Sequence, residues 1–99
     1  MFVHVVLFWL DKNTPESVRD QMRKDAVECL KDIPTVAHVF AGKPVMAPDE
    51  IAGKSYHLGL CVVFQSSADH DAYQVHPLHR KYIAQYGQYW SKIESFDFQ

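Results

Sequence analysis

The sequence predicts an α+β fold in which strands and helical regions follow one another in the order βαββαβ. Two observations lead to this prediction. Short runs rich in β-branched and aromatic residues recur four times along the chain, which is typical of strands. Two segments with apolar residues at helical spacing lie after the first and third of these runs. The length of 99 residues corresponds to one domain, residues 1–99.

The first expected strand, residues 2–10, is apolar on both faces. Successive residues of a strand point to opposite sides of the sheet, so the two sides can be considered separately. One side carries Phe2, His4, Val6, Phe8 and Leu10, and the other carries Val3, Val5, Leu7 and Trp9. Alternation therefore does not decide which side meets the helices, but it indicates that both sides are covered.

The first expected helix begins in the segment NTPES. Thr14 is a good N-cap, Pro15 suits the first helical position, and Glu16 complements the helix dipole. Apolar residues then recur at helical spacing, and charged residues occupy the opposite side. We expect the helix to end before Pro34, because the residue that precedes a proline disfavours the helical conformation.

Two further strands are expected at residues 36–45 and 56–64. The polar segment between them contains Pro48 and Gly53, which are typical of turns, so we expect a hairpin loop there. The strand at residues 56–64 is again apolar on both faces.

The second helical region is expected to be split in two. Ser66 or Ser67 caps its first helix, and the pair His76-Pro77 breaks that helix or caps a new one. A further helix is then expected over residues 78–88.

The last expected strand, residues 93–98, completes a ferredoxin-like unit, in which helices cover one face of a four-stranded antiparallel sheet. The other face is also apolar but has no helices to cover it. A second copy of the chain, packed sheet to sheet, is the simplest cover. The sequence therefore predicts a homodimer that forms through the sheet face.

Charge and composition argue against several kinds of partner. The net charge is −2 and the basic residues are scattered, which argues against nucleic acid. No segment approaches the roughly 20 apolar residues of a membrane span, and the N-terminal run lacks the features of a signal peptide. Cys29 and Cys61 are expected to be free thiols in a reducing compartment, so we expect a cytoplasmic protein.

The candidates for chemistry are His4, Tyr73, His76 and His79. His79 lies in line with Ile83 on the apolar side of its expected helix. A neutral imidazole beside a tyrosine in an apolar pocket is a general base with a pKa near neutrality. Tyr73 would orient this base or hold a carbonyl oxygen. The alternative for His79 is a core histidine with satisfied hydrogen bonds, and His76 has a simpler role as an N-cap.

Metal binding is the other use of two histidines spaced as in HxxH. Zinc requires further ligands in close geometry. His4, His57 or Cys61 are available as donors, but no recognised spacing joins them, so no metal is expected. The remaining histidines, including His38 and His70, are interpreted as ordinary strand or surface residues. No glycine-rich phosphate loop or serine nucleophile motif is present in the sequence, and no cofactor is expected.

Three motifs, taken together, resemble the stress-responsive A/B barrel (Dabb) family. They are the N-terminal strand HVVLFWL, the YxxHPxH element within YQVHPLHRKY, and the closing segment WSKIESFDF. The resemblance covers essentially all 99 residues. It implies a ferredoxin-like βαββαβ unit, two copies of which join their sheets into a dimeric α/β barrel.

One enzymatic branch of that family, a plant polyketide cyclase, closes a linear chain by an aldol reaction without metal or organic cofactor. The resemblance implies that His79 is the catalytic histidine of the HPxH element. It likewise implies that Tyr73 is the tyrosine of the preceding helix and that His4 is the supporting histidine of the first strand. The residues expected to line the pocket and bind the substrate are Val6, Phe8, Met22, Tyr82, Ile83 and Trp90.

Three functions are consistent with these residues. The first is a cofactor-independent cyclase, lyase or isomerase that acts on a small apolar carbonyl compound. The second is a non-enzymatic stress-responsive or ligand-binding dimer. The third is a cofactor-free monooxygenase, which rests on fold analogy alone. A ligand-sized cavity shared by His79 and Tyr73 would favour the first two, whereas a filled core would remove the enzymatic interpretation.

Overall fold

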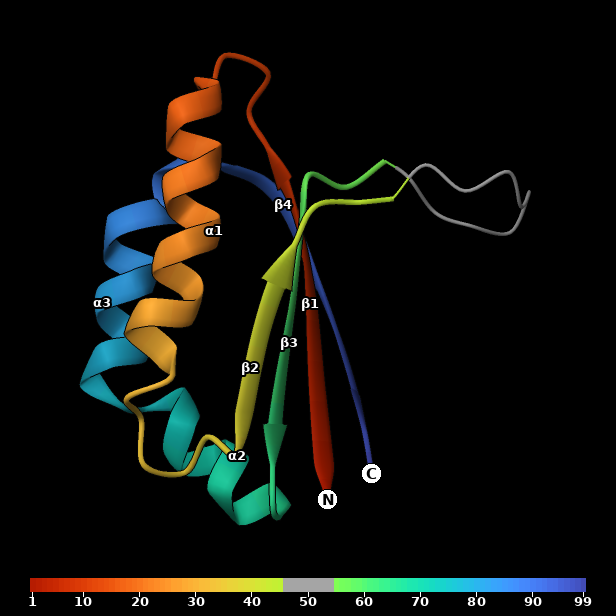
Figure 1. Ribbon diagram of the computed structural model, residues 1–99, viewed down its shortest axis with the longest axis vertical. Coiled ribbons are helices and arrows are strands. Elements are labelled where there is room, and N and C mark those ends of the chain that lie inside the picture. The colour runs from red at the N-terminus through yellow and green to blue at the C-terminus, as the bar shows by residue number, and fades with distance from the viewer. Residues whose placement is uncertain (46–54) are drawn as a thin grey trace.

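The sheet of the computed structural model contains four antiparallel strands in the order β2-β3-β1-β4, with the helices on one of its faces (Figure 1). The structure describes residues 1–45 and 55–99. The strands are β1 (Phe2–Leu10), β2 (His38–Gly42), β3 (Leu58–Phe64) and β4 (Trp90–Phe98). The helices are α1 (Glu16–Leu30), α2 (Ser67–Gln74) and α3 (Pro77–Tyr86), and a turn of 3-10 helix follows at Gly87–Tyr89. This arrangement confirms the predicted ferredoxin-like α+β fold.

Helix α1 begins one residue later than predicted. Pro15 is the N-cap, with an extended backbone (φ −60°, ψ 148°), and its carbonyl accepts the N–H groups of Val18 and Arg19. Thr14 instead donates its own N–H to the carbonyl of Asp11, and its side chain is buried. The prediction that Thr14 caps the helix is therefore wrong, because a tight turn already holds this residue inside the molecule.

Strand β2 is shorter than the predicted residues 36–45. Before it, the N–H of Val36 bonds to the carbonyl of Ile33 in a turn. After it, Pro44 has no N–H with which to extend the ladder. The hairpin loop expected around Pro48 and Gly53 lies outside the described residues.

The boundaries of β3 and β4 also differ from the predictions. Strand β3 begins at Leu58, two residues late, whereas β4 begins at Trp90 instead of Ile93. The ladder between β1 and β4 continues past a register shift between Trp9 and Leu10, so that Leu10 pairs with Trp90. Such an irregularity hides the first residues of β4 from a search for strict alternation.

The expected break in the second helical region is present. The side chain of Ser66 accepts the N–H of Asp69 and caps α2. His76 Nδ1 accepts the N–H of Leu78 at 3.1 Å, and Pro77 is the first residue of α3. Because proline is tolerated at a first helical position, the same residue ends one helix and starts the next.

The helices cover the side of the sheet that contains His4. The buried residues on this side are Phe2, His4, Val6, Phe8 and Leu10 of β1 and Leu58, Leu60, Val62 and Phe64 of β3. The alternate residues of both strands are half-buried on the outer side. The sequence pattern left open which face of β1 meets the helices. The structure shows that it is the face that carries the imidazole of His4.

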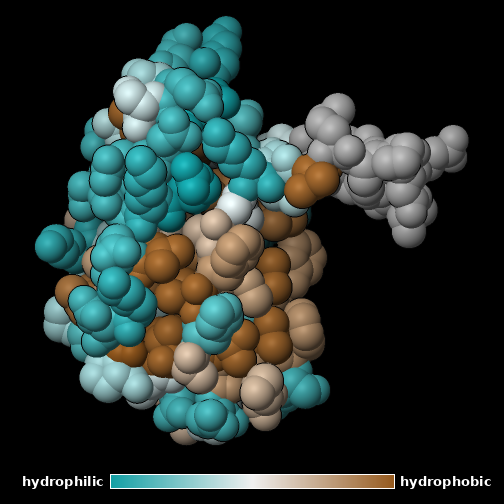
Figure 2. Space-filling view, in the orientation of Figure 1, coloured by the Kyte–Doolittle hydropathy of each residue, from teal (hydrophilic) through white to brown (hydrophobic). Residues whose placement is uncertain are grey.

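The outer side of the sheet exposes large apolar side chains. Phe40 of β2 is 63% exposed, and Phe96 and Phe98 of β4 are 51% and 58% exposed. Figure 2 views the molecule from the β2 side and shows hydrophilic residues over the helices and hydrophobic residues near the sheet. Within the described residues, no helix is both long and apolar enough to cross a membrane.

Candidate functional site

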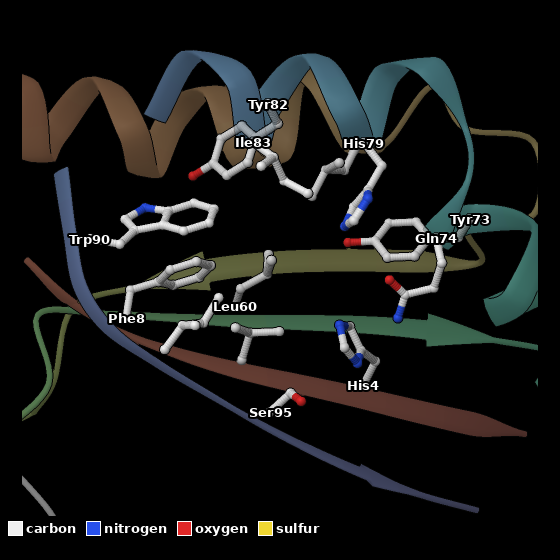
Figure 3. A pocket seen from close by; sticks show the side chains of 13 residues that line it. His4, Phe8, Leu60, Tyr73, Gln74, His79, Tyr82, Ile83, Trp90 and Ser95 are labelled. Carbon is white, nitrogen blue, oxygen red and sulfur yellow. The ribbon is translucent and has the colours of Figure 1, made fainter. Parts of the chain in front are cut away.

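A cavity of about 270 Å³ lies between α3 and the helix-facing side of the sheet (Figure 3). Its volume is close to the lower limit, about 300 Å³, of usual small-molecule sites. The lining residues are His4, Val6, Phe8, Leu30, Leu60, Tyr73, Gln74, His79, Tyr82, Ile83, Trp90, Ile93 and Ser95. Figure 3 shows the rings of Phe8 and Trp90 at one end. The side chains of His4, Tyr73 and His79 gather at the other end.

The sheet register explains which strand residues reach the cavity. On β1, the alternation that directs His4 toward the helices also directs Val6 and Phe8 there. Residues directly opposite on antiparallel strands share a face. The register pairs Val6 with Ser95 and Phe8 with Ile93, so β4 contributes these two side chains to the same cavity.

His79 contacts Tyr73 inside the cavity. Their ring centroids are 4.6 Å apart and the ring planes are inclined by 54°. Burial lowers the pKa of His79; the backbone carbonyl of Gln74 partly offsets this shift, and the rings of His4 and His70 add to it. Nδ1 of His79 is buried and makes no hydrogen bond of standard geometry with the described residues. The imidazole is therefore neutral at pH 7.

Tyr73 is almost completely buried, with 1% of its surface exposed. Its ring packs against Phe64 at 5.0 Å and His4 at 5.9 Å between centroids. Burial raises the pKa of Tyr73 well above its ordinary value, so the hydroxyl group keeps its proton. Figure 3 shows this hydroxyl group directed into the cavity beside the imidazole of His79. The pair offers a neutral base and a hydrogen-bond donor at one place.

His4 is held by a residue that sequence reasoning missed. Nδ1 of His4 and Oδ1 of Asp97 are 2.5 Å apart, and the two residues are register partners on β1 and β4. Only 6% of His4 is exposed. In the alternating segment IESFDF, Asp97 falls on the same face as Ile93 and Ser95. This alternation is visible in the sequence, but it indicates a contact with His4 only once the helix-facing side of β1 is known.

His70 was interpreted as a surface residue, and the structure contradicts this. It is 8% exposed on α2, with its ring 4.5 Å from that of Phe2 and 4.7 Å from that of His4. Gln74 Nε2 lies 2.9 Å from His70 Nε2. Burial, followed by the nearby His4, lowers the pKa of His70. His4, His70 and Asp97 each place one donor atom within 4.8 Å of the others, a cluster that no other metal-binding side chains form within the described residues.

The structure brings most of the predicted lining residues together, but Met22 lies elsewhere. Val6, Phe8, Tyr82, Ile83 and Trp90 all line the cavity. Met22 is fully buried in α1 and is separate from the lining. Its backbone carbonyl accepts a hydrogen bond from the hydroxyl group of Tyr82 at 2.9 Å, and Tyr82 itself lines the cavity. The prediction that Met22 lines the cavity is therefore wrong, because its backbone lies against Tyr82, which lines the cavity in its place.

Solved structures from several different organisms have the same fold. A dimeric ferredoxin-like protein of unknown function from Thermobifida fusca is 18% identical, with a TM-score of 0.82, covering 98% of this chain and 88% of that one. A Dabb family protein from Mesorhizobium loti is 23% identical, with a TM-score of 0.78 and coverage of 99% and 94%. A hydroxynitrile lyase from Passiflora edulis is 15% identical, with a TM-score of 0.84 and coverage of 98% and 90%.

At identities this low, the solved structures show that the fold is shared and carry no statement about activity. The comparison with curated proteins found no match. The family model of the stress responsive A/B barrel domain matches residues 2–99, which is nearly the whole chain. This chain belongs to the stress responsive A/B barrel (Dabb) family.

Proposed function

We propose that the cavity is the active site of an enzyme that removes a proton next to a carbonyl group. The observation that carries the proposal is the contact between His79 and Tyr73 in a ligand-sized cavity. Burial keeps the imidazole neutral and the phenol protonated, which are the two states that this reaction requires. His79 is the base, and Tyr73 binds the oxygen on which negative charge develops.

The proton transfer follows from the arrangement of the two rings. With the proton of His79 on the buried Nδ1, the lone pair of Nε2 is available to the substrate. Nε2 takes the proton from the carbon next to the carbonyl, and the electron pair of the broken C–H bond moves to the carbonyl oxygen. The hydroxyl group of Tyr73 donates a hydrogen bond to the resulting enolate. The enolate then attacks a second carbonyl, as in a cyclase or lyase, and His79 returns its proton to the alkoxide that forms. In an isomerase, His79 instead returns the proton to another carbon of the enolate.

The two ends of the cavity limit the substrate to a small molecule with one polar end. The polar groups of His4, Tyr73 and His79 would take the carbonyl group (Figure 3). Phe8 and Trp90, whose ring centroids are 4.9 Å apart, would hold an apolar tail. A volume of about 270 Å³ suits a tail of roughly one aromatic ring and not a long alkyl chain.

We also propose that the protein is a homodimer formed through the outer side of the sheet. The exposed Phe40, Phe96 and Phe98 support this, because a monomer rarely exposes a continuous apolar surface of this kind. The similar structure from Thermobifida fusca is a dimer.

Proton exchange in D₂O tests the enzymatic proposal without knowledge of the natural substrate. The probe is 4-phenylbutan-2-one, a small ketone with an apolar tail, and proton NMR measures the loss of its α-proton signals. We expect the protein to accelerate exchange well above the buffer rate. Binding of the ketone, seen as shifts of its NMR signals, without any acceleration would contradict the enzyme and leave the non-enzymatic ligand-binding protein.

A further inference from the structure

We propose that His4, His70 and Asp97 form a binding site for a divalent transition-metal ion such as Zn²⁺ at the polar end of the cavity. Two imidazoles and one carboxylate are a common zinc ligand set when water completes the coordination. One donor atom of each residue already lies within 4.8 Å of the other two. The three residues come from β1, α2 and β4, so the fold and not one local motif assembles them.

The ligand atoms need only small side-chain movements to reach metal-binding distances. Zinc–ligand bonds of about 2.0–2.2 Å in a tetrahedral site put ligand atoms about 3.3 Å apart. His4 Nδ1 and Asp97 Oδ1, now 2.5 Å apart, would separate slightly as the ion replaces the proton between them. The remaining separations would shorten from 4.8 Å or less. The changes amount to about 0.8 Å for the first pair and at most about 1.5 Å for the others.

The surroundings of the three residues favour a cation. His4 and His70 are 6% and 8% exposed, so both imidazoles are already oriented by packing. The amide nitrogen of Gln74 lies 2.9 Å from His70 Nε2, a contact that helps to fix the orientation of the His70 ring. Among the described residues, His4 is the partner of Asp97 in an ion pair, and no lysine or arginine neutralises this carboxylate. The Asp97 side chain is 39% exposed, which gives an ion access from solvent.

The donor chemistry selects the kind of ion. Imidazole nitrogen suits zinc, copper, nickel and iron, whereas magnesium and calcium prefer sites made of oxygen ligands. With two nitrogen donors and one carboxylate, the site should bind Zn²⁺ or Co²⁺ and should not bind Mg²⁺. The inference goes beyond the proposed function, because the base His79 and the oxygen-binding Tyr73 are not ligands and only His4 belongs to both groups of residues.

Isothermal titration of the tag-free protein with Zn²⁺ tests the site, and visible absorption of bound Co²⁺ reports nitrogen ligation. We expect one Zn²⁺ ion per chain and no heat from Mg²⁺. His70→Gln and Asp97→Asn should each weaken binding by at least about tenfold, the effect of losing even an outer-shell partner. His38→Gln, which removes an exposed histidine of β2, and His79→Ala should bind as the wild type does.

Circular dichroism on each variant checks folding. If His70→Gln does not fold, Zn²⁺ binding by the Asp97→Asn protein alone decides the test. Absence of binding to the wild-type protein would overturn the proposal, as would equal affinity in the folded His70→Gln or Asp97→Asn protein. Retained binding in His79→Ala separates this result from the proposed proton abstraction, which that substitution removes.

Discussion

The environment of His79 determines how the site should respond to pH. Its ring is faced by Tyr73 and His70 from α2 and by His4 from β1, and burial is the largest cause of its lowered pKa. A lowered pKa means that the unfolded chain binds a proton more readily than the folded chain between the two pKa values. Proton uptake on acidification therefore favours unfolding.

We predict that the free energy of unfolding falls as the pH decreases below about 6.5, the ordinary pKa of histidine. His79→Gln should show a shallower fall, since glutamine does not titrate and the burial penalty disappears. His57 and His70, whose pKa values are also lowered by burial, remain in both proteins and contribute equally. Urea denaturation from pH 5 to pH 8 measures the difference, and parallel pH profiles would show that His79 is not desolvated.

Tyr73→Phe tests the second group of the pair. The variant keeps the buried ring and its contacts with Phe64 and His4, but it removes the hydrogen-bond donor. We predict a loss of about tenfold in the rate of proton exchange, which corresponds to one hydrogen bond of roughly 1.4 kcal/mol. Thermal unfolding of both proteins provides the control. An unchanged exchange rate would exclude Tyr73 as the oxygen-binding group.

The break between α2 and α3 positions both residues of the pair. Tyr73 lies in the last turn of α2 and His79 in the first turn of α3, so the angle between the helices brings the two rings together. His76 is the connection, because its side chain caps α3 while Pro77 prevents α2 from continuing. The HPxH element thus sets local structure as well as supplying the proposed base.

We predict that His76→Ala lowers the free energy of unfolding by about 1 kcal/mol, the usual loss for a helix N-cap. His76→Asn, which retains a side-chain acceptor for the N–H of Leu78, should recover most of this stability. Chemical denaturation measures both changes. If His76→Asn is no more stable than His76→Ala, the capping hydrogen bond does not account for the role of His76.

Sequence reasoning located elements more reliably than their ends. The caps at Ser66 and His76 were predictable because they depend on a few neighbouring residues. The start of β4 was not, because the register shift at Trp9 and Leu10 depends on the paired strand. Tertiary packing decided these boundaries.

The residues of the candidate site likewise include some that the sequence reveals and some that only the folded structure reveals. His79 and Tyr73 were found through helical register and the family motif, both of which are visible in the chain itself. His70 was missed because it stands between Asp69 and Asp71, and such polar neighbours give no sign of burial. Asp97 was missed because its partnership with His4 joins two strands at opposite ends of the sequence.

At the scale of the whole molecule, none of the helices in residues 1–45 and 55–99 covers the outer side of the sheet. Val5 lies in the middle of this outer side, opposite Phe96 of β4 and Cys61 of β3. The proposed dimer would bury all three. The interface should then exceed about 2,000 Å² in total, as is usual for obligate dimers.

We predict that Val5→Asp converts the dimer to a monomer or an aggregate, because an unpaired charge in the interface costs several kcal/mol. Ala84→Asp is the matched control, since it places the same carboxylate at an exposed position of α3. Size-exclusion chromatography with light scattering measures the mass of each variant. A wild-type monomer at micromolar concentration, or a normal dimer of Val5→Asp, would contradict the assignment of this surface.

The rate of α-proton exchange in His79→Ala tests the central claim most directly. The comparison uses 4-phenylbutan-2-one in D₂O with wild-type protein, His79→Ala and Arg80→Ala, which makes the same truncation at the neighbouring exposed position of α3. We predict that Arg80→Ala keeps the wild-type rate and that His79→Ala loses about 100-fold or more, the contribution usual for a general base. A folded His79→Ala protein that exchanges protons at the wild-type rate would contradict the account.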